Sequence, residues 1–232
     1  MSKNKKILTN LDSKDVTLVN FNDEKGNFSW DIYKKSQQKM SYRKIHNAGP
    51  HRKKMEILGK HIKNNITDYK FGICHGTRNG IEQKHLRDIL GIEVIGTEIA
   101  DGCEKFPHQI QWDFHDVKDE WIGNVDFIFS NSLDHSYDPV YCLSQWIKCM
   151  KDGGIIYLQH DNGIEDIHRK YSSDSGKKLP KYNADCFFTT IDGYRKIVKQ
   201  ASNDKWIIEL PESLYFKGNN NTRYFIIKKR EN

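Results

Sequence analysis

The sequence has no apolar run long enough to cross a membrane. A membrane helix needs about 18 or more consecutive apolar residues, and no segment of the 232 residues approaches that length. The first ten residues, MSKNKKILTN, also lack the apolar middle of a signal peptide. We therefore expect a cytoplasmic protein that does not bind membranes.

Cysteine is scarce as well. The five cysteines are odd in number, and no two of them have C-x-x-C spacing, so the sequence encodes neither a disulfide framework nor a zinc site. In contrast, apolar residues make up 37% of the chain and include 11 Phe, 11 Tyr and 5 Trp. This composition and length are typical of one globular domain with an additional arm.

Positive charge is concentrated at the start of the chain. Residues 1–70 hold 16 Lys and Arg against 7 Asp and Glu, a net charge of +9, whereas the remainder carries −3. Such an asymmetry favours an anionic partner, which could be a nucleic acid, a phosphorylated metabolite or a nucleotide sugar. A solvated, lysine-rich surface explains the same charge.

From residue 66 onward, short apolar runs alternate with amphipathic stretches. Strands are predicted at 69–75, 92–99, 108–114, 125–132, 154–160, 205–213 and 222–230, and helices at 80–90, 139–150 and 190–202. This alternation predicts an α/β fold: a Rossmann-like three-layer sandwich with a mostly parallel seven-stranded sheet. The Gly-Asn-rich stretch between the last two runs predicts an antiparallel terminal hairpin.

Residues 1–65 form a basic, mainly helical arm in this prediction, and residues 66–232 form the sheet domain. The arm contains two helical patterns, which break at residues 47–50. Tyr42, Arg43 and His46 combine aromatic and basic groups in a way that suits a phosphate or nucleotide. We expect the arm to act as a lid or to bind the substrate, although a solvated basic helix would have the same pattern.

The residues that follow each predicted strand are the candidate binding residues, because ligands of open α/β sheets bind at the carboxyl ends of the strands. The predicted cofactor residues are His75, Gly76, Thr77, Arg78, Gly80, Glu98, Ile99, Trp112, Asp113, Phe114, Asn131 and Ser132. Glu98 lies 22 residues beyond Gly76, near the separation at which an acid binds a ribose hydroxyl pair. Together these positions predict a nucleoside pocket, in which Asp113 and a neighbouring ring contact a purine.

The loop after the first strand, FGICHGTRNG, limits the choice of cofactor. A dinucleotide loop has several glycines, so that the backbone can approach the pyrophosphate closely. Here Cys74 and Arg78 occupy two of the glycine positions. A nucleoside cofactor without pyrophosphate therefore fits better than a nicotinamide dinucleotide.

Read in order, these segments resemble the class I S-adenosylmethionine-dependent methyltransferases, especially small ubiquinone-methylase-like enzymes. The segments that carry the resemblance are FGICHGTRNG, VIGTEIA, WDFHD, VDFIFSNSLDHSYDP and CLSQWIKCMKDGGIIYLQH, followed by the closing helix and hairpin. The resemblance implies S-adenosylmethionine as the cofactor. The loop FGICHGTRNG departs from the usual sequence of that family at three positions. Gly72 replaces the usual acid, and Cys74 and Arg78 replace the outer glycines. Arg78 is expected to pair either with the methionine carboxylate of the cofactor or with an acid at the helix start.

Methyl transfer to a hydroxyl requires alignment and removal of a proton. His135 and His160 follow strands on the pocket side, so they are the predicted bases. Asp134 and Asp161 are the predicted substrate contacts beside them. The alternative is that Asp134, His160 and Asp161 gather a divalent ion around a sugar diol, but nothing in their spacing requires it, and we expect no metal.

The preferred function from the sequence is methyl transfer to a small, anionic acceptor. O-methylation of a sugar or nucleotide sugar, in surface polysaccharide biosynthesis, is the specific expectation. An RNA methyltransferase that uses the basic arm is the first alternative, and a non-catalytic nucleoside-binding module is the second. Nothing in the sequence predicts the oligomeric state.

Overall fold

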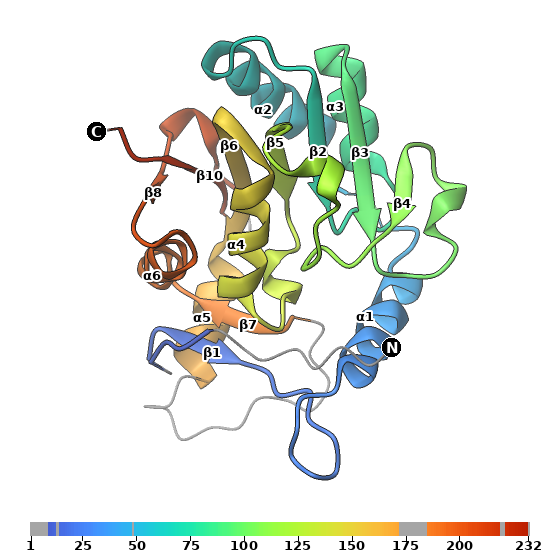
Figure 1. The fold of residues 1–232 in the computed structure, drawn as a ribbon, viewed down its shortest axis with the longest axis vertical. Coiled ribbons are helices and arrows are strands. Elements are labelled where there is room, and N and C mark those ends of the chain that lie inside the picture. Colours follow the sequence, from blue (N-terminus) through green and yellow to red (C-terminus); the bar gives the residue numbers. More distant parts are fainter. Residues whose placement is uncertain (1–8, 13, 48, 172–184, 219–220, 232) are drawn as a thin grey trace.

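Figure 1 shows the computed structural model, in which residues 9–12, 14–47, 49–171, 185–218 and 221–231 are described. The strands are β1 (Val16–Leu18), β2 (Phe71–His75), β3 (Glu93–Glu98), β4 (Gln109–Gln111), β5 (Val125–Ser130), β6 (Met150–Asp161), β7 (Phe187–Thr189), β8 (Trp206–Glu209), β9 (Tyr215–Phe216) and β10 (Thr222–Lys229). The α-helices are α1 (Trp30–Arg43), α2 (Arg52–Asn65), α3 (Ile81–Leu90), α4 (Pro139–Cys149), α5 (Asn162–Tyr171) and α6 (Ile191–Ser202). Short 3₁₀ turns include η1 (Cys103–Lys105) and η3 (Leu133–His135).

The main sheet has the strand order β4-β3-β2-β5-β6-β10-β8, and β9 pairs with β10. Neighbours from β4 to β6 are parallel, and Ile73 at the centre pairs with Ile95 on one side and Ile128 on the other. β10 runs antiparallel to β6 and to β8. The predicted α/β fold, with its mostly parallel sheet and antiparallel end, is confirmed.

Helices cover both faces of the sheet because its central strands are apolar on both faces. On β5, Phe127 and Phe129 belong to the core cluster under α2 and α3, whereas Ile128 belongs to the cluster under α4 and α6. This is the period-2 alternation of a strand that is buried on both sides. The order of the strands reverses between β2 and β5, which places a crevice at their carboxyl ends.

The predicted arm contains a strand in addition to its two helices. Its strand β1 pairs antiparallel with β7, where Val16 lies opposite Thr189. The Thr189 hydroxyl donates to the Asp15 carbonyl at 2.6 Å. This two-stranded sheet lies apart from the main one (Figure 1), and its three-residue strands are too short to show a period in the sequence.

The two helices of the arm occupy different places. α2 packs against α3 and buries Met55, Leu58 and Ile62 completely in the main core. α1 instead lies near the ends of β3 and β4 (Figure 1). Its first turn is capped by Ser29, whose hydroxyl accepts from the Ile32 N–H at 3.4 Å. In the described part of the chain, no helix is long and apolar enough to span a membrane.

Candidate functional site

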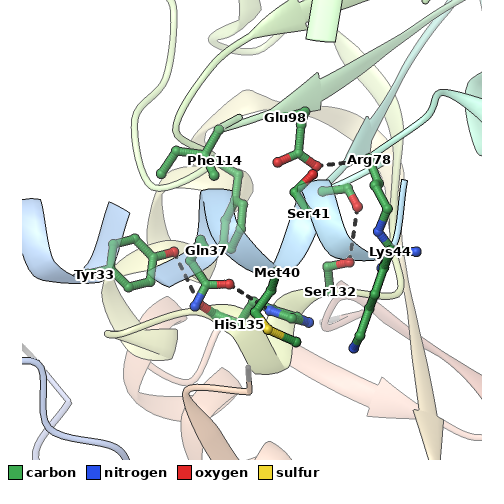
Figure 2. A pocket seen from close by; sticks show the side chains of 12 residues that line it. Tyr33, Gln37, Met40, Ser41, Lys44, Arg78, Glu98, Phe114, Ser132 and His135 are labelled. Atoms are coloured by element: carbon green, nitrogen blue, oxygen red, sulfur yellow. Dashed lines mark hydrogen bonds between the residues drawn. The ribbon is translucent and has the colours of Figure 1, made fainter. Parts of the chain in front are cut away.

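A cavity lies at the carboxyl ends of β2, β3, β4 and β5, and α1 covers it (Figure 2). We call it the first cavity. It is lined by Tyr33, Gln37, Met40, Ser41, Lys44, Gly76, Arg78, Glu98, Ile99, Phe114, Ser132 and His135. Seven of these are sequence-predicted site residues, and the other five, four from α1 and its C-cap Lys44, were not predicted. The α1 residues have the spacing of one helix face.

Gly76 is the turning point of the loop after β2. Its φ of +73° lies in the left-handed region, and a Cβ atom there would lie 2.6 Å from the Cβ of Ser132. The Gly76 N–H donates to the Thr97 carbonyl at 2.9 Å, and the Ser132 hydroxyl donates to the Gly76 carbonyl at 3.1 Å. The loop is therefore held close to the ends of β3 and β5, where only glycine fits.

Glu98 ends β3 inside this crevice and is 7% exposed. Its carboxylate accepts from the N–H of Arg78 at 2.9 Å and from the N–H of Ala100 at 3.1 Å. These two backbone donors hold a buried charge at a fixed position. Because each carboxylate oxygen can accept more than one hydrogen bond, Glu98 can still accept from ligand hydroxyls in the cavity.

α1 is tied down over the cavity by hydrogen bonds to several strand ends. Tyr33 donates to the His135 carbonyl at 3.1 Å, and Trp30 donates to Asp113 at 2.9 Å. Tyr42 donates to the Asp101 carbonyl at 2.9 Å. As a result the first cavity encloses only about 40 Å³, whereas pockets for small molecules measure about 300–1,000 Å³. The hydroxyl oxygen of Ser41, on the cavity side of α1, is buried and has no hydrogen-bond partner in the part of the chain that the structure describes.

A second cavity of about 320 Å³ lies across the loop from the first. Its lining residues are Gly49, Pro50, His51, Lys54, Gly76, Thr77, Arg78, Asn79, Glu82, Asn131 and Gln159. Gly76 and Arg78 line both cavities. A ligand that follows the loop would therefore reach from one cavity to the other.

Glu82 is the buried acid of the second cavity and is 4% exposed. Its Oε1 accepts from the Asn131 side chain at 3.1 Å, but its Oε2 has no hydrogen-bond partner among the described residues. Burial raises the pKa of Glu82 to about 7, although the Asn131 hydrogen bond and the Arg78 charge act in the opposite direction. An unsatisfied buried carboxylate oxygen is costly, and it marks a place where a ligand donor would be stabilising.

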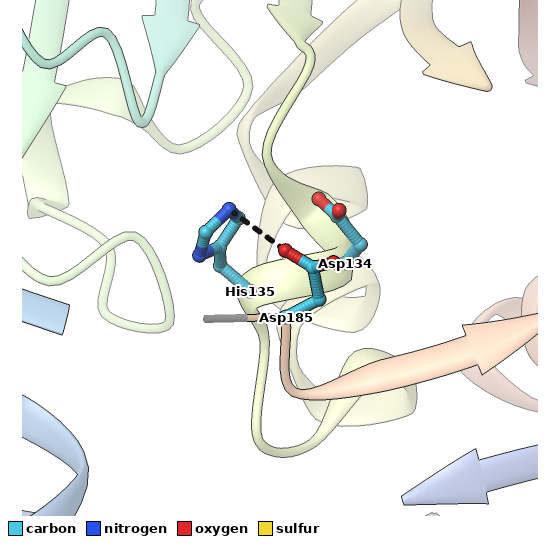
Figure 3. Close-up of side chains that lie close together, drawn as sticks. All are labelled: Asp134, His135 and Asp185. Atoms are coloured by element: carbon cyan, nitrogen blue, oxygen red, sulfur yellow. Dashed lines mark ion pairs between the residues drawn. The ribbon is translucent and has the colours of Figure 1, made fainter. Parts of the chain in front are cut away.

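His135 lies between the first cavity and two aspartates (Figure 3). Its Nδ1 is 2.8 Å from Gln37 Oε1, and its Nε2 is 3.6 Å from Asp185 Oδ1. Burial lowers the pKa of His135, whereas Asp185 raises it and Lys44 lowers it further. Burial together with Asp185 and Asp161 raises the pKa of Asp134 well above its usual value.

Solved structures with the same fold are methyltransferases. The plantazolicin methyltransferase BpumL in complex with S-adenosylhomocysteine (SAH) matches with a TM-score of 0.61 and 11% identity over 86% of this chain and 96% of that one. A Methanococcus maripaludis protein described as S-adenosylmethionine-dependent matches with a TM-score of 0.55, 13% identity and coverages of 86% and 94%. A methyltransferase in complex with the Haloferax volcanii activator Trm112 matches with a TM-score of 0.55, 12% identity and coverages of 86% and 98%. No protein-family model and no curated protein matches the sequence.

The chain has the class I methyltransferase fold. This confirms the fold that the sequence resemblance implied. In this fold the first cavity holds Gly76, Arg78, Glu98, Ile99, Phe114 and Ser132 of the predicted cofactor residues. Thr77 and Asn131 line the second cavity. Gly80 lines neither cavity. It is the N-cap residue before α3, and its φ of +77° is left-handed.

Three predicted cofactor residues are placed elsewhere in the methyltransferase fold. The His75 side chain is buried against Trp146, with ring centroids 4.6 Å apart, and its Nδ1 is 2.8 Å from the Thr97 hydroxyl. Burial lowers the pKa of His75 to about 3. Trp112 donates to the Asp116 carbonyl at 2.7 Å. The His75 side chain is thus buried away from both cavities, whereas the cofactor contact of the half-buried Trp112 stays a prediction.

Asp113 is also engaged with protein groups. One oxygen accepts from Trp30, and the other accepts from the His115 N–H at 3.0 Å and faces His115 Nδ1 at 2.7 Å. Phe114, the residue that follows Asp113, lines the first cavity, whereas Asp113 does not. The expected purine contact of Asp113 stays a prediction that would require the Trp30 hydrogen bond to change.

The remaining predicted residues lie outside both cavities. His160 is 4% exposed, and its Nε2 is 3.1 Å from Glu165 Oε1, while burial lowers its pKa. Asp161 accepts from the Gly163 N–H at 3.0 Å. Tyr42, Arg43 and His46 lie on the exposed side at the end of α1. From this part of the arm, only Ser41 and Lys44 reach the first cavity.

Proposed function

We propose that this chain is an S-adenosylmethionine-dependent methyltransferase that acts on a small acceptor. The observation that carries the proposal is the buried Glu98 carboxylate, held at the end of β3 beside the Gly76 turn, in a chain with the class I methyltransferase fold. A carboxylate at this position of a doubly wound sheet suits a ribose diol. The similarity of the fold supports the same cofactor.

The cavity residues fit the parts of this cofactor. We assign Glu98 to the ribose hydroxyls, and Ile99 and Phe114 to the adenine ring. We assign the unpartnered Glu82 Oε2 to the cofactor's ammonium group, because a charged donor satisfies a buried carboxylate best. Arg78, which lines both cavities, is assigned to the carboxylate.

When bound, the cofactor supplies a methyl group activated by a sulfonium. The chain's own residues align the acceptor, exclude water and accept a proton. α1 excludes water, since four of its residues and its C-cap Lys44 cover the first cavity. His135 is the cavity residue positioned to accept a proton from the acceptor, and its lowered pKa keeps the ring neutral. His160 is retained only as the alternative base.

We propose an anionic, hydroxyl-bearing acceptor, with a sugar or nucleotide sugar of surface polysaccharide biosynthesis in the cytoplasm as the specific candidate. Lys44 and Arg78 line the first cavity, and His51 and Lys54 line the second. These groups suit phosphate or carboxylate oxygens. In the described residues, no separate domain for binding RNA is present, which favours a small acceptor over RNA.

Isothermal titration calorimetry with SAH and with NAD tests the cofactor assignment. We expect SAH to bind with a stoichiometry of one per chain and NAD to bind far more weakly. Tighter binding of NAD would refute the proposal. Transfer of radioactive methyl from S-adenosylmethionine, measured against separate pools of nucleotide sugars and of RNA, tests the acceptor class, and labelling of the RNA pool alone would replace the small acceptor by RNA.

A further inference from the structure

Three potential metal ligands converge beside the first cavity (Figure 3). Asp134 and His135 belong to the turn η3, and Asp185 lies just before β7. One ligand atom from each residue lies within 4.8 Å of the others. The N–H of Cys186, the residue after Asp185, donates to the Asp134 carbonyl at 2.6 Å, which holds Asp185 beside the turn.

The tautomer of His135 is set by a residue outside this cluster. The Gln37 amide nitrogen donates to the sulfur of Cys186 at 3.2 Å, which turns its oxygen toward His135 Nδ1 at 2.8 Å. An amide oxygen only accepts, so Nδ1 carries the hydrogen. In the neutral ring the lone pair is then on Nε2, on the side of the Asp185 carboxylate.

Negative charge accumulates around this lone pair. One carboxylate oxygen of Asp134 and one of Asp185 lie within 4.8 Å of each other and of a ring nitrogen of His135. In the described part of the chain, the ion pair of Asp185 is with His135, at 3.6 Å. Two carboxylates and an imidazole lone pair that face one another are stabilised by a cation between them.

We propose that Asp134, His135 Nε2 and Asp185 bind one divalent transition-metal ion, for which Mn²⁺ is the best match. Two ligands bonded to one ion at about 2.0–2.2 Å lie about 3–3.5 Å apart, close to the 3.6 Å between His135 and Asp185. One imidazole with two carboxylates suits Mn²⁺ or Zn²⁺ better than Mg²⁺ or Ca²⁺. A rotation of the Asp134 side chain completes the set.

The site has room for further ligands. The His135 and Asp185 side chains are 21% and 26% exposed, so the ion would keep open positions. His135 also lines the first cavity, which places these positions where acceptor oxygens arrive. A role of the ion in binding acceptor oxygens rests on the proposed function. The presence of a metal site differs from the metal-free site that we expected from the sequence. With the ion bound, His135 is a ligand and not a base.

Direct binding of Mn²⁺ tests the site without any assay of activity. The full chain, stripped with EDTA and desalted, is titrated with MnCl₂, and free Mn²⁺ is measured by electron paramagnetic resonance. We expect one ion per chain. Asp134→Asn and Asp185→Asn should each weaken binding by roughly 10–100-fold or more. The matched control is Asp166→Asn, because Asp166 is an exposed aspartate of α5 that pairs with Arg169.

Circular dichroism confirms that each variant is folded before titration. Absence of bound Mn²⁺ in the wild-type chain, or equal binding by all three variants, overturns the proposal. SAH binding to the stripped chain separates this result from the proposed function. SAH binding without Mn²⁺ binding refutes the metal site alone, whereas Mn²⁺ binding without SAH binding refutes the cofactor and leaves the metal site standing.

Discussion

Replacement of Glu82 by Gln tests how the second cavity works. The carboxyl is buried, its Oε2 lacks a partner, and its pKa is raised from 4.5 to about 7. A raised acid pKa means that the folded state holds its proton more tightly than the unfolded state. The corresponding stability is present below pH 4.5 and is lost as the pH rises through 7.

The size of this loss follows from the shift. One pKa unit corresponds to about 1.4 kcal/mol, so the wild-type chain should lose roughly 2–3 kcal/mol between pH 5 and pH 8 through Glu82 alone. Glu82→Gln has no such titration. Urea denaturation at both pH values should therefore show the variant gaining stability relative to the wild type as the pH rises.

Cofactor affinity should change in the opposite direction. At pH 8 the ionised Glu82 would face the ammonium group, and loss of one charge-assisted hydrogen bond costs about 1.5–3 kcal/mol, or about 10–150-fold in the dissociation constant for SAH. Calorimetry should show that wild-type affinity rises between pH 6 and pH 8. In Glu82→Gln this rise should be absent.

The matched control is Glu104→Gln, because Glu104 is an exposed acid on η1. It should follow the wild type in both measurements. Wild-type affinity for SAH in Glu82→Gln at pH 8 would show that Glu82 does not bind the ammonium group. An unchanged pH profile of stability would show instead that the Glu82 carboxyl is not perturbed.

Three other substitutions test the first cavity. Glu98→Gln should weaken SAH binding by about 1–3 kcal/mol in calorimetry, and unchanged affinity would mean that the ribose lies elsewhere. Gly76→Ala should destabilise the chain by more than Gly102→Ala in urea denaturation, because both have φ near +70° but only Gly76 has Ser132 within 4 Å of the added Cβ; equal losses would contradict the steric argument. Arg78→Gly should bind SAH at least about tenfold more weakly and should be more stable than Arg78→Ala, since glycine relieves the left-handed φ; wild-type affinity would remove Arg78 from the site.

The sequence predicted the sheet and the strand-end residues because both depend on local patterns. Alternation along each strand marks where it ends, and parallel strands bring those ends to one edge. That is why Gly76, Glu98 and Ser132 meet in one cavity. The same alternation could have excluded His75, which shares a face with the buried Ile73 two residues earlier.

The parts that the sequence did not predict depend on contacts between distant segments. The α1 residues that line the first cavity have helical spacing, but the spacing does not tell which surface the helix covers. Its position comes from hydrogen bonds such as those of Trp30 with Asp113 and Tyr33 with His135. Asp185 approaches His135 because the neighbouring Cys186 N–H donates to the Asp134 carbonyl at 2.6 Å, a contact that has no periodic signal in the sequence.

Arg78 connects the unusual loop to the proposed chemistry. Its φ of +45° is left-handed, a conformation that costs a non-glycine residue about 1–2 kcal/mol, and the family usually has glycine at this position. Backbone strain of this kind is often found at functional sites, which agrees with the proposed role of the Arg78 side chain in binding the cofactor. Arg78 is also the side chain that lines both cavities. The loop thus replaces a glycine, which only lets the backbone approach a ligand, by a guanidinium able to bind the ligand's carboxylate directly.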